Sequence, residues 1–455
     1  MEPNAFPRPP PFTWEHVELR DPLPIYPPPE PLQLPSLPSP PRKPAFDAPY
    51  TLTTHLLPAS YLRTTRPVPE LEPVPANLPK EDRRRLLSDT RRQLDELRTS
   101  KVTDGYPRVL WNCVNRYVKN DLLEGRRSEK TGVTLFFAHA NGFPKEIFEP
   151  TLGHLLSSPA ASIVDEVWVW ESVQHGDAGI INARHASALF DWLDNARDIS
   201  NFLLHFLPKH TTEGRLPTHL SRLSPAETER RFKSGFSDRK LVALGHSYGG
   251  CTSSLAAAFY PSLFTSLILI DPVIISPNDR KGREGRGPDL ASGALSRRDT
   301  WPSRAAALES FTKSPFFQAW DPAVLKIYHE CGLYDTTDEQ GNPIVKLKTS
   351  GMQEAVVFAE VHTPYEAYVR LSKLDKRIAV RWVMPGKPGA PELGMPGGTP
   401  FKVWVRPDNS TNTQIYGGGH LIPQEAPREF AEDLSKYLMY QFASTVLPLP
   451  PRPRL

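Results

Sequence analysis

Hydrophobic residues fall in short unbroken runs along the middle of the chain, and helical patterns separate these runs. Four runs have the length of strands and lack polar alternation: 133–140, 165–172, 239–247 and 266–274. Strands that are buried on both faces have this pattern. The segment FDWLDNARDISNFLLHFL (190–207) repeats apolar residues at helical spacing. Strands that alternate with helices predict the α/β class, with a mostly parallel sheet and helices on both faces.

The regular alternation is interrupted before it resumes at RIAVRWVMPG (377–386). The interruption, residues 276–375, contains a basic glycine-rich loop and then helical patterns with many aromatic residues. An insertion between two sheet strands commonly covers their carboxyl ends, where α/β sheets bind ligands. We therefore predict a helical lid at 276–375, between a first core part at 46–275 and a second core part at 376–447.

The N-terminal tract has a different composition, because 17 of the first 50 residues are proline. Proline lacks an N–H donor and fixes φ, so this tract cannot propagate a helix or a sheet. We predict an extended or disordered tail at 1–45, either a strap over the surface or a ligand for a proline-recognising module. A second proline-rich tail is predicted at 448–455. Between the tract and the regular alternation, the pattern predicts strands at 51–62 and 108–118 and a charged helix at 80–98.

The composition argues against several classes of partner and binding site. The 54 basic and 51 acidic residues leave a net charge of +3, which favours neither a nucleic-acid partner nor a strongly acidic one. Three separated cysteines (Cys113, Cys251 and Cys331) give neither a disulfide framework nor a zinc-binding spacing. The chain shows no signal-peptide pattern and no run near the ~20 apolar residues of a membrane span. We expect a soluble intracellular protein without a metal or cofactor.

A serine lies between glycines in LVALGHSYGG (241–250), after an apolar strand and before a small-residue helix. The pattern matches G-x-S-x-G, the nucleophile elbow, in which a tight turn strains the serine backbone and exposes Oγ. Ser247 is therefore the predicted nucleophile, and the N–H of Tyr248 is a predicted oxyanion donor. The alternative is a glycine-rich turn with a serine helix cap. The strand–turn–helix context favours the elbow.

A serine hydroxyl needs a base to become a strong nucleophile. His420, in IYGGGHLIPQE, follows the last predicted strand and completes the chain order serine, acid, histidine. The three glycines before it allow this loop to approach the elbow closely. His246 is the rival histidine, but as the second residue of the elbow motif it is expected to point away from the site.

The acid has three candidates. The usual position, after the penultimate strand, contains no aspartate and only Glu392. Asp271 ends the preceding apolar run, SLILIDPVI, and Asp408 lies in RPDNSTN. An aspartate that closes an apolar strand needs a hydrogen-bond donor, and a histidine N–H would supply one. We therefore rank Asp271 first, Glu392 second and Asp408 third.

A second oxyanion donor is predicted in AHANGFPKEIF (138–148), directly after an apolar strand. A loop in this place contributes the other N–H of an oxyanion hole in proteins with a nucleophile elbow. We assign that donor to Asn141 or its immediate neighbours. The alternative is a plain turn.

Several of these stretches together resemble the α/β-hydrolase superfamily, and within it a fungal group of peroxisomal lipase-type and toxin-biosynthesis hydrolases. The most specific stretch is HANGFPKE, and the resemblance covers residues 46–445. The stretches are FFAHANGFPKEIFEP, DEVWVWE with HGDAGIIN, ALGHSYGG, LILIDPVI, RRDTWPSR and GGGHLIPQEAP.

The resemblance implies an α/β-hydrolase fold with a lid, and serine hydrolase chemistry on an ester or thioester of an apolar or secondary-metabolite substrate. Carried onto this chain, the catalytic triad is Ser247, His420 and Asp271, acting through an acyl-enzyme without a cofactor. Two alternatives stay open: a non-catalytic binding or scaffold protein of the same fold, and an acyl-transfer enzyme.

The chain ends in Pro453-Arg454-Leu455. This tripeptide is similar to the peroxisomal Ser-Lys-Leu signal, although proline departs from it at the first position. A peroxisomal import receptor is therefore a possible partner, and the expected compartment is the peroxisome or the cytoplasm.

Overall fold

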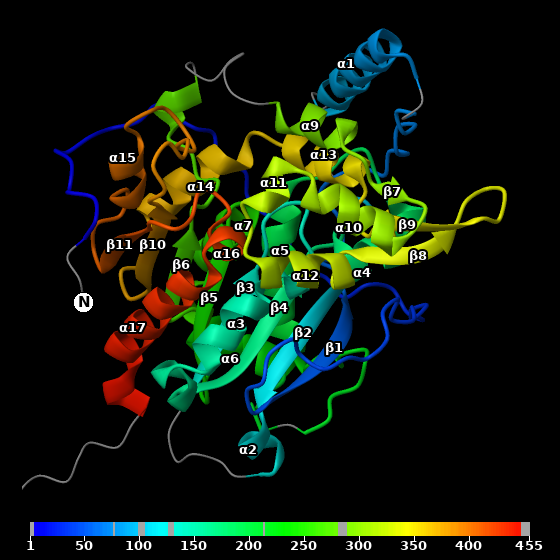
Figure 1. Cartoon of the computed structure of the whole chain (residues 1–455). Coiled ribbons are helices and arrows are strands. Elements are labelled where there is room, and N and C mark those ends of the chain that lie inside the picture. Colours follow the sequence, from blue (N-terminus) through cyan, green and yellow to red (C-terminus); the bar gives the residue numbers. More distant parts are fainter. Residues whose placement is uncertain are drawn as a thin grey trace, which may run out of the picture.

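The computed structural model describes residues 4–75, 78–98, 105–125, 132–212, 214–280 and 289–446 (Figure 1). In this part of the chain an eight-stranded sheet has the order β1-β2-β4-β3-β5-β6-β10-β11. The pairs β1–β2 and β2–β4 are antiparallel, and the remaining neighbours are parallel, which confirms the predicted mostly parallel sheet. The strands are β1 Tyr50–Pro58, β2 Trp111–Lys119, β3 Val133–Ala138, β4 Val164–Glu171, β5 Lys240–His246, β6 Ser266–Ile270, β10 Ala379–Pro385 and β11 Ser410–Ile415.

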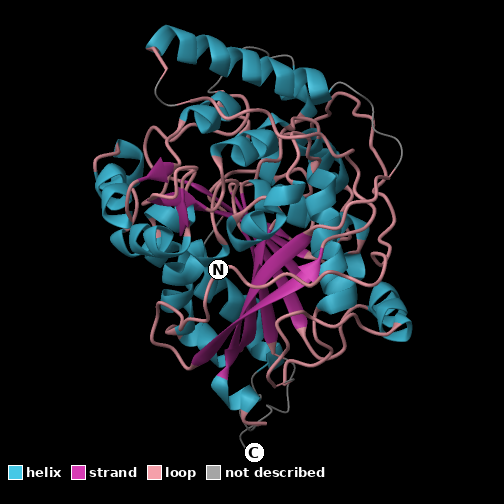
Figure 2. Cartoon of the chain, turned by 90° about the vertical axis from the view of Figure 1, so that its right-hand side faces the viewer, coloured by secondary structure: helices cyan, strands magenta, loops and turns pink. Residues whose placement is uncertain are grey.

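Successive residues of the central strands point into two different cores. In β5, Leu241 and Ala243 belong to one hydrophobic cluster, whereas Val242 and Leu244 belong to the other. All four side chains are buried, so the strand has no polar face, as its sequence pattern predicted. Helices α5 and α7 contribute to the first cluster and α3 and α17 to the second, and Figure 2 shows helices on both sides of the sheet.

The helices outside the insertion connect and cover these strands. Helix α1 coincides with the charged helix predicted at 80–98, and it lies at the edge of the molecule (Figure 2). These helices are α1 Lys80–Arg98, α2 Asn120–Leu123, α3 Glu149–Leu156, α4 Gly176–Asn182, α5 Trp192–Asn201, α6 Pro225–Ser234, α7 Tyr248–Phe259, α15 Thr399–Val403, α16 Ile422–Glu425 and α17 Pro427–Val446.

The insertion between β6 and β10 has mixed α and β structure, where the sequence pattern predicted helices alone. Its helices are α9 Leu290–Ser296, α10 Arg304–Thr312, α11 Pro315–Gln318, α12 Pro322–Cys331, α13 Gly351–Ala359 and α14 Thr363–Ser372. A three-stranded antiparallel sheet of order β7-β9-β8 accompanies them, with β7 Thr300–Trp301, β8 Leu333–Thr337 and β9 Pro343–Leu347. Most of these elements gather in the upper half of Figure 1. The boundaries proposed for the lid remain a prediction.

The proline-rich tract lies on the surface of the domain, and we call residues 4–49 the N-terminal strap. Within these residues the structure describes no helix and no regular strand. Phe12 packs edge-on against Phe401 of α15, with 5.0 Å between ring centroids. Trp404 Nε1 donates a hydrogen bond to the carbonyl oxygen of Phe6 at 3.0 Å. These contacts show residues of the tract lying against α15, whereas recognition by a proline-binding module stays a prediction.

The described helices include none with both the length and the apolar character that a membrane crossing requires. The second proline-rich tail, 448–455, lies outside the described residues.

Candidate active site

Ser247 occupies the turn between β5 and α7 in a strained backbone conformation. Its φ and ψ are 55° and −116°, a region that L-residues rarely adopt. Two backbone hydrogen bonds hold the turn against the end of β6: Ser247 N–H donates to Ile270, and Val273 N–H donates to Ser247, both at 3.0 Å. The turn has the strained backbone predicted for the elbow and lies at the carboxyl end of the parallel strands, but Ser247 is only 7% exposed.

The two glycines of the motif are required by close backbone contacts. A Cβ on Gly245 would lie 2.5 Å from the carbonyl oxygen of Gly249, and a Cβ on Gly249 would lie 2.4 Å from that of Ala138. Real Cβ atoms do not approach other atoms so closely, so only glycine fits either position. The second contact brings the elbow against the end of β3, beside the loop at 138–148.

The structure brings together the three residues first ranked for the triad. His420 lies in the loop after β11, and its Nε2 is 3.0 Å from Ser247 Oγ. Its Nδ1 is 2.7 Å from Oδ2 of Asp271, which directly follows β6 and is only 1% exposed. With the proton on Nδ1 donated to the carboxylate, Nε2 is left to accept the serine proton. The arrangement has the geometry of a Ser-His-Asp triad.

The two other candidate acids lie in different environments. Glu392 accepts hydrogen bonds from the backbone N–H and the hydroxyl of Thr399, at 2.9 and 2.6 Å, and so caps the start of α15. Asp408 forms an exposed ion pair with Lys376. Asp271 is the one of the three that hydrogen-bonds to His420.

The side chain of His246 contacts the loop that carries His420, whereas the motif led us to expect it to point away from the site. It is buried at the end of β5, and its Nε2 hydrogen-bonds to the backbone carbonyl of His420 at 2.8 Å. Burial lowers the pKa of His246 to about 3, so the ring is neutral and donates this bond. The side chain therefore supports the His420 loop. The sequence pattern missed this contact because it does not reveal where that loop folds.

A buried lysine, which sequence reasoning did not single out, lies beside Asp271, the predicted acid. Lys402 Nζ is 3.5 Å from Asp271 Oδ1, whereas His420 contacts the other carboxylate oxygen. Burial alone would raise the pKa of Asp271, but Lys402 and the hydrogen bond from His420 hold that pKa below its ordinary value. The carboxylate is therefore ionised at neutral pH.

The loop at 138–148 is fixed by the side chain of Asn141. Its Nδ2 donates to the backbone carbonyl of Glu354 in α13 at 3.0 Å, and its Oδ1 is 2.9 Å from Nε2 of His175. Nδ1 of His175 is in turn 2.6 Å from Ser172 Oγ. Because the Asn141 side chain is engaged in this way, backbone amides remain the candidate oxyanion donors of the loop. The side-chain bonds would hold those amides in position.

Tyr248 begins α7 immediately after Ser247. The first N–H groups of a helix have no intrahelical acceptor, and the helix dipole places partial positive charge there. The ring of Tyr248 packs edge-on against Trp192, with 4.8 Å between centroids, and so anchors the start of the helix. The amide of Tyr248, at the start of α7, remains the predicted oxyanion donor.

A buried cluster near the end of β4 has the residue types of a metal site. Ligand atoms of Cys113, Glu171 and Asp177 lie within 4.8 Å of one another. Lys145 Nζ lies among them, 3.2 Å from Glu171 and 2.8 Å from Asp177. The lysine cation already pairs with both carboxylates, so these residues suit an ion-pair cluster better than a divalent cation.

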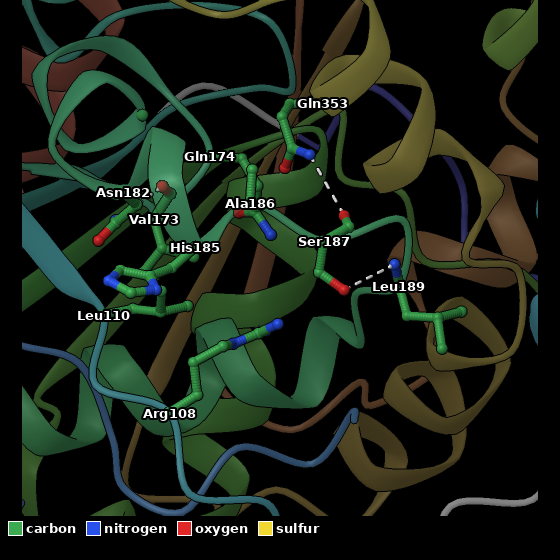
Figure 3. A pocket seen from close by; sticks show the side chains of 11 residues that line it. Arg108, Leu110, Val173, Gln174, Asn182, His185, Ala186, Ser187, Leu189 and Gln353 are labelled. Carbon is green, nitrogen blue, oxygen red and sulfur yellow. Dashed lines mark hydrogen bonds between the residues drawn. The ribbon is translucent and has the colours of Figure 1, made fainter. Parts of the chain in front are cut away.

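One small cavity is lined by residues on either side of α4 and by α13 (Figure 3). Arg108, Gln174 and His185 are among its lining residues, and Gln353 Nε2 donates to the carbonyl oxygen of Ser187 at its edge. Its volume of about 30 Å³ suits a few water molecules rather than an ester substrate. Ser247 is not among its lining residues.

The parallel sheet, the serine elbow and the ordered triad geometry define the α/β-hydrolase class. The chain matches the alpha/beta hydrolase family over residues 135–433 and belongs to that family. The solved structure of the peroxisomal alpha-beta-hydrolase Lpx1 from Saccharomyces cerevisiae superposes with a TM-score of 0.58 at 19% identity. This likeness covers 89% of this chain and 93% of the yeast chain.

Fungal relatives are similar in sequence, as the resemblance predicted. The Saccharomyces cerevisiae peroxisomal membrane protein LPX1 is 26% identical over 337 residues, which cover 70% of this chain and 78% of that protein. A type I acyl-CoA thioesterase, mpaH of Penicillium roqueforti, is 31% identical over 190 residues, 42% of this chain. The match spans only 37% of the thioesterase. The Alternaria alternata protein AFT2-1, an abhydrolase domain-containing protein, is 31% identical over 137 residues, 30% of this chain and 48% of that protein.

Proposed function

We propose that this protein is a serine hydrolase that cleaves an ester or thioester through an acyl-enzyme. The observation that carries the proposal is the continuous hydrogen-bonded line from Asp271 through His420 to Ser247. Its serine stands on a strained turn next to a helix N-terminus. These features together supply a nucleophile, a base and an electrostatic site for the developing oxyanion.

Each residue has a defined role in this proposal. Ser247 Oγ attacks the substrate carbonyl while His420 Nε2 removes its proton. Asp271 orients the imidazole and stabilises its cation. Amides of Tyr248 and of the Asn141 region bind the oxyanion. His420 then returns the proton to the leaving alcohol or thiol, and water, activated by the same histidine, releases the acid from the acyl-enzyme.

Aromatic residues of the insertion support an apolar acyl group as the substrate. Phe143, in the loop after β3, packs against Trp320 and Tyr328, with ring centroids 5.5 and 6.2 Å apart. The inserted elements therefore place buried aromatic side chains next to the loop that would hold the oxyanion. A thioester substrate is also consistent with the name of the Penicillium relative, an acyl-CoA thioesterase.

Two alternatives, a non-catalytic binding protein and an acyl-transfer enzyme, make different demands on the site. A non-catalytic binding protein has no need of an acid within hydrogen-bond reach of His420, and Asp271 lies within that reach. An acyl-transfer enzyme would share the triad and differ only in the acceptor of the acyl group. Peroxisomal import through residues 453–455 stays a prediction, because these residues lie outside the described part of the chain.

The first experiment compares wild type with Ser247→Ala. Both are treated with a fluorophosphonate probe and then assayed on p-nitrophenyl esters and acyl thioesters of graded chain length. We expect labelling of wild type at Ser247 and its loss in the variant, with kcat/KM lowered by about four orders of magnitude. Ser253→Ala is the matched control, because Ser253 lies in α7 with a buried hydroxyl that has no hydrogen-bond partner among the described residues.

The control variant should label and turn over like wild type. A folded wild-type protein that neither labels nor hydrolyses any of these substrates would contradict the proposed hydrolase. Transfer of the acyl group to an added alcohol or thiol in preference to water would replace hydrolysis by acyl transfer.

A further inference from the structure

Lys402 is a buried lysine that forms an ion pair with Asp271. Its side chain belongs to α15 and the residue is only 3% exposed. Nζ lies 3.5 Å from Asp271 Oδ1 and forms no hydrogen bond with any described residue. A buried ammonium group is unfavourable unless a charge or a set of acceptors compensates it. The carboxylate of the triad acid is the group placed to do so.

The surroundings of α15 fix this lysine in place. Glu392 caps the first turn of the helix through Thr399. On the outer side, Phe401 packs against Phe12 of the N-terminal strap, and its carbonyl accepts a hydrogen bond from the hydroxyl of Tyr368 at 3.1 Å. Because the helix is held at its start and on its outer face, the Lys402 side chain is held toward the triad.

We propose that Lys402 is a positioning residue of the triad, which keeps the Asp271 carboxylate ionised and turned toward His420. The inference rests on the proposed hydrolase function. The carboxylate has two partners on its two oxygens, the His420 ring on Oδ2 and the Lys402 ammonium on Oδ1. Partners on both oxygens favour the orientation in which Oδ2 faces His420.

The charged and titratable groups around Asp271 determine how its pKa changes when Lys402 is replaced. They are Lys402 from α15, His420 from the loop after β11, and His246 from β5. Glu392 also lies within electrostatic range of Lys402. His246 is neutral because burial lowers its pKa, so Lys402 is the basic side chain that faces Asp271 beside His420. Removal of Lys402 takes away one of the influences that oppose burial, while the hydrogen bond from His420 remains, and the pKa of Asp271 rises.

The test compares Lys402→Met and Lys402→Arg with wild type in kcat, KM and the pH profile of kcat/KM. In Lys402→Met we expect kcat to fall about 10- to 100-fold with KM changed less than about twofold. We also expect the acidic limb of the profile to move upward by about one pH unit, because loss of the Lys402 charge favours the protonated forms of the neighbouring triad groups. Lys402→Arg should keep the limb where it is in wild type.

Lys376→Met is the matched control, since Lys376 forms an exposed ion pair with Asp408 rather than with the triad acid. It should leave both the profile and kcat unchanged. A folded Lys402→Met protein with the wild-type kcat and acidic limb overturns the inference. If that variant does not fold, Lys402→Gln decides in the same way, since glutamine removes the charge and keeps a polar side chain.

Failure of the proposed function gives a different result. In that case wild type itself does not react with the fluorophosphonate probe. If only the role proposed for Lys402 is wrong, wild type and Lys402→Met react with the probe equally well.

Discussion

The positive φ of Ser247 is sustained by two neighbouring positions that have no side chain. The contacts that a Cβ on Gly245 or Gly249 would make are with backbone atoms, which cannot rotate away as a side chain can. The strained serine and its glycines therefore form one unit. The backbone conformation of the predicted nucleophile, which is only 7% exposed, depends on residues that take no part in the chemistry.

Substitution of Gly249 by alanine tests this unit. Because the new Cβ would lie 2.4 Å from the Ala138 carbonyl oxygen, we expect the free energy of unfolding to fall by about 2 kcal/mol or more. Fluorophosphonate labelling should also slow, since the elbow must shift to relieve the contact. Chemical unfolding followed by tryptophan fluorescence measures the first effect. Gly293→Ala in α9 is the control, because nothing lies within 4 Å of its added Cβ.

The control should be neutral or slightly stabilising, by up to about 1 kcal/mol, since alanine is the better helix former. A Gly249→Ala protein as stable and as reactive as wild type would show that the elbow can relax without loss.

The end of β4 carries a pH-sensitive element that is separate from the triad. Glu171, its last residue, accepts hydrogen bonds from the backbone of Lys145 and Ala178, both at 3.2 Å. Burial raises the pKa of Glu171 to about 7, although the Lys145 cation opposes the rise. A carboxyl whose pKa is raised by folding favours the folded state when protonated. Its contribution is complete below the unfolded pKa and is lost as pH rises through about 7.

We therefore expect the free energy of unfolding to decrease between pH 5.5 and pH 8.5, and to decrease less in Glu171→Gln. The difference between the two proteins should amount to roughly 1–3 kcal/mol over this interval. Urea unfolding at the two pH values measures it. Equal slopes for wild type and variant would show that Glu171 does not titrate in this interval.

Much of the architecture could be predicted because the central strands are buried on both faces. An unbroken apolar run such as 241–244, with helical patterns on both sides, is typical of a strand in the middle of a parallel sheet. The small sheet of the insertion could not be predicted in the same way. In β8, LYDTT, only Leu333 is buried, and a short polar strand of this kind resembles a loop in sequence.

The site was predictable where a motif fixes local geometry, and ambiguous where it depends on long-range folding. Ser247 and Tyr248 belong to a five-residue pattern whose geometry is set by its strand–turn–helix context. The acid required knowledge of which strand end meets the His420 loop. Lys402 lay beyond sequence reasoning, because the run FKVWV shows a lysine on a short helix without showing which side of the helix is buried.

At the scale of the whole molecule, the N-terminal strap packs against the elements that lie beside the predicted triad. Phe12 and Trp14 pack against the same hydrophobic cluster that contains Tyr368, and Trp14 lies 5.4 Å from the ring of Tyr368. Arg20 forms ion pairs with Asp191 and Glu366 on the domain. The strap therefore covers α14 and α15, the second of which holds Lys402.

We expect the double substitution Phe12→Ala with Trp14→Ala to lower the free energy of unfolding by about 2–4 kcal/mol, because two half-buried aromatic side chains are lost. We also expect kcat to decrease several-fold, since α15 loses its outer support. Thermal unfolding and ester hydrolysis measure the two effects. Leu34→Ala, at a strap position that is 58% exposed, should change neither. Wild-type stability in the double variant would mean that the strap contributes nothing to the fold.

The strap contacts also constrain the order in which the chain matures on the ribosome. Asn4 and Phe6 hydrogen-bond to Asn412 of β11, across sequence separations of 408 and 406 residues. At ordinary rates of translation, roughly 20 to 80 s pass between synthesis of the two partners. During that interval Asn4 and Phe6 lack their partner on β11. Docking of these strap residues is therefore a late event, because it requires that β11 has already been translated.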